Sequence, residues 1–195
     1  MQNSKLIKKV KNYINTLLLP LDNFYYHHYE HALDVMDRVI YLWKKEHLNN
    51  EDIEILAISA LFHDTWFVIK YDNNEKFWAK IARNFLKSIL YPKEKIEKIE
   101  KIILSTALKA KPKTILEKII KDADLDNLWR NDFFKKWAIL KKEIETIKRI
   151  KIKDPDWIHA SIDLLCNHKY FTETQQKERE EKKKENLKTL KKNIK

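Results

Sequence analysis

Apolar residues recur at spacings of three and four along most of the chain, the pattern that places them on one face of an α-helix. In residues 5–19 the apolar stripe runs from Leu6 to Leu18, and Pro20 ends it. The same spacing predicts further helices, which cover residues 25–48, 74–90, 93–107, 114–121, 132–150, 156–167 and 172–194. No segment alternates apolar and polar residues strongly enough to indicate a strand. The pattern therefore predicts a chain that is helical throughout.

Residues 53–62 depart from this pattern, because apolar residues occupy more than one face there. A helix that is apolar nearly all round is buried in the centre of a fold. Asn49 and Asn50 offer a cap in front of it, and His63 and Asp64 follow it directly. We therefore expect these last two side chains at the edge of the core, on backbone that the buried helix holds fixed.

Composition favours the same fold class. The 195 residues include no glycine and only four prolines. A chain of this length can bury one sizeable core, whereas two full domains would be cramped. We predict an all-α, single-domain compact bundle of about eight helices over residues 1–176, followed by a charged helical tail over residues 177–195. The tail is interpreted as a solvated helix that frays at its end, with phosphate or RNA contact as the alternative.

The charge narrows the expected partners. A formal net charge of +11 favours anionic partners. Lysine outnumbers arginine 35 to 5, however, and nucleic-acid surfaces often use the planar guanidinium group of arginine. The preferred interpretation is a solvated, lysine-coated surface, so nucleic acid is not the expected partner.

The sequence also bears on location. The longest uncharged stretch near the start, residues 12–21, is about half as long as the ~20 residues that a membrane-spanning helix needs. It also lacks the arrangement of a signal peptide. The single Cys166 excludes an internal disulfide, and its apolar surroundings predict a buried or half-buried side chain. We expect a cytoplasmic protein with no membrane partner.

Candidate chemistry lies in His31, the adjacent pair His63 and Asp64, and Asp124. Two neutral imidazoles and two carboxylates can hold one divalent metal ion, and such an ion can activate water against a phosphate ester. His27 lies four residues before His31, so the two share a face if both are helical. His31 leads into an apolar stretch and is the better ligand, which leaves His27 to face whatever the metal holds. The alternative is that each residue is an ordinary hydrogen-bonded polar group.

These residues stand in short motifs that together resemble a known family. The motifs are Tyr26-His27-His28-Tyr29-Glu30-His31-Ala32-Leu33, Ala60-Leu61-Phe62-His63-Asp64-Thr65, Asp72-Asn73-Asn74-Glu75 and Asp122-Ala123-Asp124-Leu125. In combination they resemble the HD superfamily of metal-dependent phosphohydrolases, whose hallmark is His…His-Asp…Asp. Residues 168–172 look similar to a small bacterial branch of that superfamily. The resemblance covers residues 25–179 and implies a helical bundle of the HD-domain type.

The resemblance implies a role for each matching residue. Metal ligands are expected at His31, His63, Asp64 and Asp124, and the catalytic residues are then Asp64 and His27. His27 matches the histidine that donates a proton to the leaving oxygen in family phosphodiesterases.

Four further residues are candidates for contact with the substrate or with the metal ligands. Glu75 could orient water or a ligand, or form a salt bridge. Lys109, Lys111 and Arg130 could neutralise phosphate, or simply carry surface charge.

The expected cofactor is a single divalent metal ion. Family members with two or more metals supply extra histidines between the His-Asp pair and the final Asp, and this chain has none between Asp64 and Asp124. Mixed nitrogen and oxygen ligands suit Mn²⁺, Mg²⁺, Co²⁺, Ni²⁺ or Zn²⁺. We predict a phosphohydrolase whose partner is a nucleotide or another small phosphorylated molecule. The alternatives are a non-catalytic metal- and nucleotide-binding sensor and a basic nucleic-acid-binding protein.

The glycine count is unusual, because a chain of this length ordinarily carries ~13 glycines. Trp66, Trp129 and Trp137 stand where relatives tend to have glycine. One hypothesis is that these are UGA codons written as tryptophan in an organism that decodes UGA as glycine. The alternative is genuine tryptophan with a locally rebuilt loop.

Overall fold

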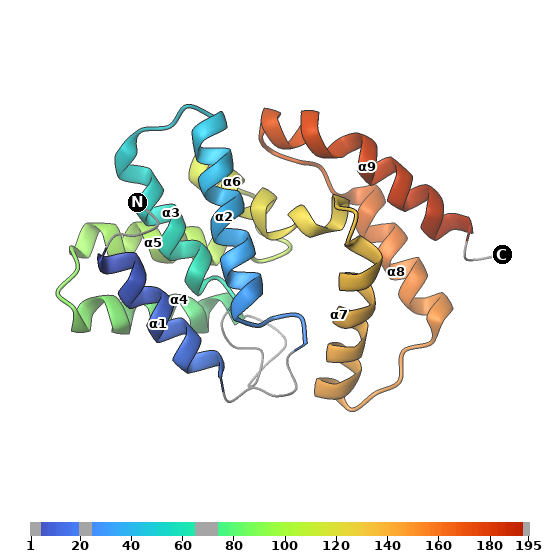
Figure 1. The fold of residues 1–195 in the computed structure, drawn as a ribbon, viewed down its shortest axis with the longest axis horizontal. Coiled ribbons are helices and arrows are strands. Elements are labelled where there is room, and N and C mark those ends of the chain that lie inside the picture. The colour runs from blue at the N-terminus through green and yellow to red at the C-terminus, as the bar shows by residue number, and fades with distance from the viewer. Residues whose placement is uncertain (1–4, 20–24, 65–73, 193–195) are drawn as a thin grey trace.

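The computed structural model describes residues 5–19, 25–64 and 74–192, and within these residues it contains helices and no strand (Figure 1). The α-helices are α1 (Lys5–Leu18), α2 (Tyr29–Lys45), α3 (Asn50–Phe62), α4 (Asn74–Ser88), α5 (Lys93–Ser105), α6 (Ile115–Asp124), α7 (Phe133–Lys148), α8 (Asp154–Asn167) and α9 (Glu173–Lys192). A short 3-10 helix, η1 (Asp126–Trp129), connects α6 to α7. The all-α prediction is confirmed, with nine α-helices in the described residues where about eight were expected.

Helix α3 occupies the centre of the fold, as its apolar pattern predicts. It contacts α1, α2, α4, α5 and α6, and every residue from Ile55 to His63 is buried. The Asn49 side chain caps its first turn by accepting hydrogen bonds from the backbone N–H groups of Glu51 and Asp52. Buried apolar side chains from α1 to α6 form one continuous cluster around α3, which we call the helical core.

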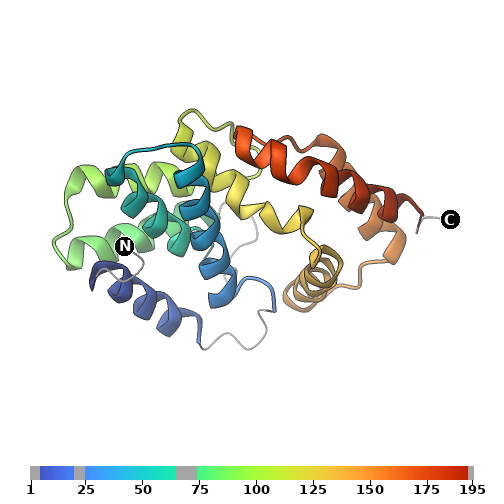
Figure 2. The same ribbon diagram turned by 45° about the horizontal axis from the view of Figure 1, so that its top comes forward.

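A second, smaller cluster lies beside the helical core. It is made by Leu128, Trp129, Phe133, Leu165, Tyr170 and Leu190, and we call residues 126–192 the C-terminal unit. Figures 1 and 2 show α7, α8 and α9 grouped on one side of the molecule, with α9 running along α8. The short helix η1 joins the two regions, since it contacts α6, α7 and α9.

Helix α9 is packed on one side, whereas a solvated tail helix was expected. Leu190 is fully buried, and the polar residues Gln175, Lys183 and Asn186 are also buried. Their polar groups have partners: the Lys183 ammonium donates to the His168 carbonyl, and Asn186 Nδ2 donates to the Leu128 carbonyl at 3.1 Å. The charged composition gives no sign of this packed face, because the aliphatic parts of long polar side chains can cover apolar surface while their charged ends stay in water.

Helix α2 begins four residues later than predicted. Residues 25–28 form a bend in front of it, and His28 occupies the N-cap position with an extended backbone. The physical reason lies in α7, where the Glu143 carboxylate accepts hydrogen bonds from the backbone N–H groups of Tyr26 and His27. The argument that His27 shares a helix face with His31 is therefore wrong.

Three helices end at a residue in the left-handed backbone region without glycine. His47, Leu90 and Arg149 have φ values of 52°, 57° and 52° after α2, α4 and α7. This region favours glycine because a Cβ atom is crowded there. A chain that lacks glycine must place side chains at these ends.

The described tryptophans do not have the backbone that would demand glycine. Trp129 and Trp137 are absent from the positive-φ positions of the described residues. Trp129 is fully buried, and Trp137 Nε1 donates to the Ser161 hydroxyl at 2.6 Å. Trp66 lies outside the described residues. The backbone argument for recoding thus fails at two of the three positions, and UGG codons in the gene would end the hypothesis.

Two further expectations concern exposure. Cys166 is exposed on α8, so the prediction of a buried or half-buried side chain is wrong. Its apolar neighbours Ile162, Leu164 and Leu165 pack in the cluster of the C-terminal unit, whereas Cys166 lies outside that face of the helix. Within the described residues, no helix combines the length and apolarity that crossing a membrane requires.

Candidate metal centre

Three helices of the core bring His31, His63 and Asp124 together. His31 lies in the first turn of α2, His63 directly follows α3, and Asp124 is the last residue of α6. One potential ligand atom from each residue lies within 4.8 Å of the other two. The Nε2 atoms of His63 and His31 are 3.2 Å and 3.6 Å from Asp124 Oδ1. Both histidines are buried while the Asp124 side chain keeps 23% exposure, so the group opens to solvent on the Asp124 side.

The orientation of His63 is set by its own helix. Its Nδ1 lies 2.7 Å from the Ala60 carbonyl oxygen. A carbonyl only accepts hydrogen bonds, so Nδ1 must carry the proton and Nε2 is left to face Asp124. Histidines that bind metals commonly donate the other ring N–H to a carbonyl or carboxylate in this way.

The three residues fit a divalent metal ion. Neither ring nitrogen of the buried His31 has a hydrogen-bond partner among the described residues. An unpartnered buried polar group costs about 1–3 kcal/mol, which ligation by a metal would remove. His63 Nε2 and Asp124 Oδ1 are both acceptors when His63 is neutral, so a proton or a cation must lie between them. Two imidazole nitrogens and a carboxylate oxygen suit the first-row divalent ions.

In the metal-free protein, a proton takes that position. Burial by itself would lower the pKa of His63, but the nearby Asp124 carboxylate outweighs it and raises that pKa to about 9. Burial opposes ionisation of Asp124, yet His63 and His31 hold its pKa below the usual range. Burial, together with the charge on His63, lowers the pKa of His31 to about 4. His31 is therefore neutral at pH 7, and His63 and Asp124 share one proton as an ion pair.

Asp64 lies next to this group without joining it. Its Oδ2 is 3.1 Å from His27 Nε2. Burial raises the pKa of Asp64 to about 6, although the positive charges of His27 and His63 oppose the rise. The role of Asp64 as a fourth ligand stays a prediction.

His27 is held between two carboxylates, one from each region of the molecule. Its Nε2 faces Asp64, and its Nδ1 pairs with Glu143 Oε1 from α7. Burial alone would lower the pKa of His27, but Asp64 and Glu143 together raise it above the ordinary value. His27 is thus an imidazole whose two ring nitrogens each face a carboxylate, and Asp64 lies between it and the three clustered side chains.

Sequence reasoning missed Glu143, whose side chain is only 1% exposed. It lies three residues after Leu140 and four before Ile147, on the helix face that these apolar residues share. A carboxylate within an apolar stripe is the signal that could have marked it.

The structure leaves the remaining predicted residues away from the three-residue group. Glu75 is half-buried in the first turn of α4 and raises the pKa of Lys121, against the larger lowering by burial. Lys109 and Lys111 are exposed between α5 and α6. The Arg130 guanidinium is already engaged, because it donates to Asp34 and Asp132. Among the described residues, none of these side chains forms a hydrogen bond or ion pair with His31, His63 or Asp124.

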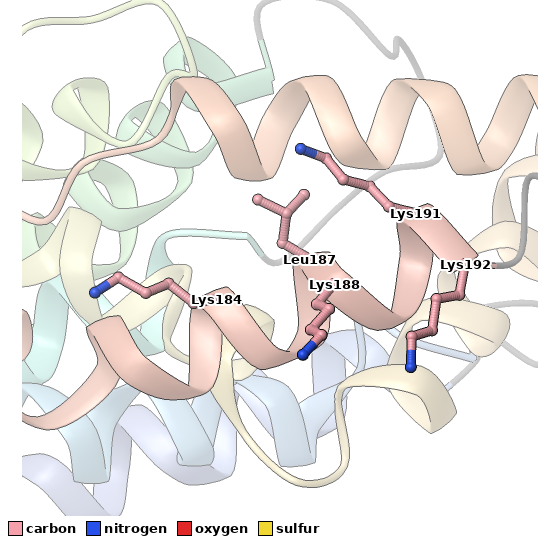
Figure 3. A pocket seen from close by; sticks show the side chains of 5 residues that line it. All are labelled: Lys184, Leu187, Lys188, Lys191 and Lys192. Carbon is pink, nitrogen blue, oxygen red and sulfur yellow. The ribbon is translucent and has the colours of Figure 1, made fainter.

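A surface hollow elsewhere in the molecule is built from α9 alone. Figure 3 shows it lined by Lys184, Leu187, Lys188, Lys191 and Lys192. These lysines account for part of the basic charge of the chain. They belong to the C-terminal unit, whereas the three clustered residues come from α2, α3 and α6.

Comparison with known proteins places this arrangement in a family. The HD-domain family model matches residues 28–126, a region that contains His31, His63 and Asp124. No curated protein sequence matches the chain.

Solved structures with a similar fold include Bacillus subtilis YpgQ in complex with ADP. That chain is 20% identical with a TM-score of 0.69, and the match covers 100% of this chain and 97% of YpgQ. A second crystal structure of B. subtilis YpgQ is 18% identical with a TM-score of 0.67, covering 100% of this chain and 98% of the other. At these identities the likeness concerns the fold. Because the family model spans about half of the chain and includes all three clustered residues, the protein belongs to the HD-domain family.

Proposed function

We propose that this protein is a metal-dependent phosphohydrolase that cleaves a phosphate ester of a nucleotide or another small phosphorylated molecule. The observation that carries the proposal is the convergence of His31, His63 and Asp124 from three helices, with neither nitrogen of the buried His31 hydrogen-bonded. Membership of the HD-domain family supports the proposal. The solved relative in complex with ADP supports a nucleotide as the ligand.

His31, His63 and Asp124 would hold one divalent metal ion, and Asp64 is proposed as the fourth ligand. When bound there, such an ion supplies Lewis-acid attraction for a phosphoryl oxygen and lowers the pKa of water. The absence of any histidine between Asp64 and Asp124 supports one ion rather than two. The ion can be Mn²⁺, Mg²⁺, Co²⁺, Ni²⁺ or Zn²⁺, since all of them accept mixed nitrogen and oxygen ligands.

The side chains of the protein supply the remaining chemistry. We propose that His27 carries a proton at Nε2, on the side of its ring that faces the Asp64 carboxylate, while Nδ1 pairs with Glu143. We propose that this proton passes to the leaving oxygen: the N–H bond at Nε2 breaks and an O–H bond forms, so that an alcohol leaves in place of an alkoxide. The rings of His31 and His63 are buried, so they line the site with groups that exclude water. Electrostatic interactions are stronger where water is excluded.

A metal analysis followed by a substrate assay tests the proposal. Purified protein is expected to contain about one equivalent of metal and to release phosphate or pyrophosphate from a panel of nucleoside mono-, di- and triphosphates when Mn²⁺ is added. Asp64→Ala is expected to abolish both metal binding and turnover. Asp163→Ala, an exposed aspartate on α8, is the matched control and should change neither.

The outcomes separate the candidate functions. An Asp64→Ala variant with full metal content and full activity would refute the assignment of Asp64. Nucleotide binding with metal but without any release of phosphate would favour a non-catalytic sensor, for which the ADP complex of the solved relative is the supporting observation.

A further inference from the structure

Glu143 connects α7 to the segment that carries His27. Its Oε2 accepts the backbone N–H of Tyr26 at 2.6 Å and that of His27 at 3.0 Å, and its Oε1 pairs with His27 Nδ1. One carboxylate thus holds both the backbone and the ring of His27. The partners lie 116 residues apart in the sequence and in different regions of the molecule.

The position of Glu143 argues for more than packing. Only Phe133 and Glu143 are buried on α7 among its described residues. Burying a carboxylate is costly unless its oxygens are hydrogen-bonded, whereas leucine or isoleucine would pack there without that cost. Within the part of the chain that the structure describes, the hydrogen bonds of the Glu143 carboxylate all go to Tyr26 and His27, so the buried charge acts on this one segment.

The geometry also determines which ring nitrogen of His27 faces Asp64. The carboxylate of Glu143 is an acceptor, so Nδ1 must carry a proton to bond with it. Nε2 is then the nitrogen directed toward Asp64. In many hydrolases, a histidine that transfers a proton is itself oriented by a hydrogen bond to another side chain, as Glu143 orients His27 here.

We propose that Glu143 is a positioning residue that orients His27 for proton donation at Nε2, and this inference rests on the proposed function. Glu143 keeps its own charge throughout. As the Nε2 proton moves to the leaving oxygen, the ring becomes neutral while Nδ1–H remains bonded to Glu143. The C-terminal unit therefore takes part in the reaction through one buried side chain.

Glu143→Gln tests the role in turnover. The amide can still accept the backbone hydrogen bonds, but it has neither the charge nor a second acceptor oxygen for Nδ1. We expect kcat to fall about 10–100-fold, as with partners that orient active-site groups elsewhere, while KM and metal content stay near the parent values. Glu143→Asp, which retains the charge, should recover part of the loss. Glu145→Gln is the matched control, because the Glu145 carboxylate on the same helix accepts the Ile152 N–H at 2.8 Å and has no hydrogen bond to Tyr26 or His27.

A double variant separates action through His27 from a general structural effect. If Glu143 acts through His27, then adding Glu143→Gln to His27→Ala causes no further loss of kcat, because the group that it orients is gone. Fully additive losses, or a Glu143→Gln variant with parent activity, would overturn the proposal. Urea unfolding of each variant accompanies the kinetics, so that a loss of folded protein is measured rather than inferred.

A spectroscopic readout keeps this test independent of turnover. In protein with ¹⁵N-labelled histidine, the His27 ring signals are identified by their disappearance in His27→Ala. Glu143→Gln should shift the Nδ1 and Nε2 signals of His27, whereas Glu145→Gln should leave them in place. If no substrate turns over, the proposed function fails. Unchanged His27 signals in a folded Glu143→Gln variant would instead overturn the orientation of His27 by Glu143.

Discussion

The helical core and the C-terminal unit differ in the kind of interaction that stabilises each of them. In the core, buried apolar side chains from all six helices surround α3. In the C-terminal unit, buried polar and charged residues are as numerous as buried apolar ones. Apolar contacts are not directional, whereas hydrogen bonds and ion pairs fix positions and orientations. It follows that apolar packing in the core stabilises the fold around the metal group, while specific polar contacts position the C-terminal unit against the core.

Those polar contacts gather around the segment that carries Asp124. Two residues before it, Asp122 accepts the backbone N–H groups of Phe171 and Thr172 and the Thr172 hydroxyl, at 2.7–3.1 Å. Two residues after it, Asp126 pairs with Arg38 at 3.0 Å and with Arg179 at 2.8 Å. The C-terminal unit is thus anchored on both sides of Asp124 in the sequence. Its helix α7 carries Glu143, which contacts His27.

The largest expected effect comes from removing a proposed ligand in the core. Asp124→Ala should abolish turnover and metal binding while leaving the apolar cluster around α3 intact. In the parent protein, metal at 100 times its Kd should add about 2.7 kcal/mol to the free energy of unfolding, and this gain should vanish in the variant. Thermal unfolding with and without Mn²⁺ measures it. A variant that is still stabilised by metal would move the site away from Asp124.

The next effect concerns the anchor of the C-terminal unit. Asp122→Ala removes the acceptor for three donors and should cost about 2 kcal/mol of unfolding free energy. Asp122→Asn keeps an accepting oxygen and should cost less. Urea unfolding followed by tryptophan fluorescence reports on this region, because Trp129, Trp137 and Trp157 lie in it. If Asp122→Ala were no more harmful than Asp163→Ala, the polar anchoring of the C-terminal unit would be disproved.

A pH series distinguishes the buried histidines of the two regions. The pKa of His63 in the core is about 9, whereas burial, with Lys183 and Lys121 adding to it, lowers the pKa of His168 to about 4. Between pH 6.5 and 8.5, His63 still carries its proton while His168 is neutral, and a metal must displace the His63 proton to bind. The apparent metal affinity should rise about tenfold per pH unit in this window, equivalent to about 1.4 kcal/mol.

Stability of the metal-free protein should change in the opposite direction. The pKa of folded His63 lies above its unfolded value, so its contribution is complete below pH 6.5 and is lost as the pH rises through about 9. For the metal-affinity prediction, calorimetric metal titrations in buffers of different ionisation enthalpy count the protons that the metal displaces from His63. A metal affinity that is flat over this range would contradict the His63–Asp124 ion pair.

The smallest effect tests the core without touching the site. Leu90 is 92% exposed and has a φ of 57° at the end of α4. Leu90→Gly should raise the free energy of unfolding by about 1 kcal/mol, because glycine adopts this backbone without a crowded Cβ. Leu90→Ala is the control, since it removes the exposed side chain and keeps the Cβ. Equal stability of the two variants would show that backbone strain at Leu90 is negligible.

The amino-acid pattern was enough to predict the helices and the central position of α3. Apolar periodicity located α1 and α3–α9 to within a few residues, because each pattern is set by neighbours on the same helix. The cap at Asn49 was equally local. The order His31, His63-Asp64, Asp124 indicated the family, which the family model confirms.

The packed tertiary fold, and no local pattern, brings distant segments together. It shortened α2 at its start, engaged Arg130 with Asp34 and Asp132, and brought Glu143 to His27. Periodicity carries no information about such pairs, because a hydrogen bond between residues 116 positions apart depends on where whole helices pack. Local patterns specify which face of a helix is buried, and the packed fold alone specifies what that face touches.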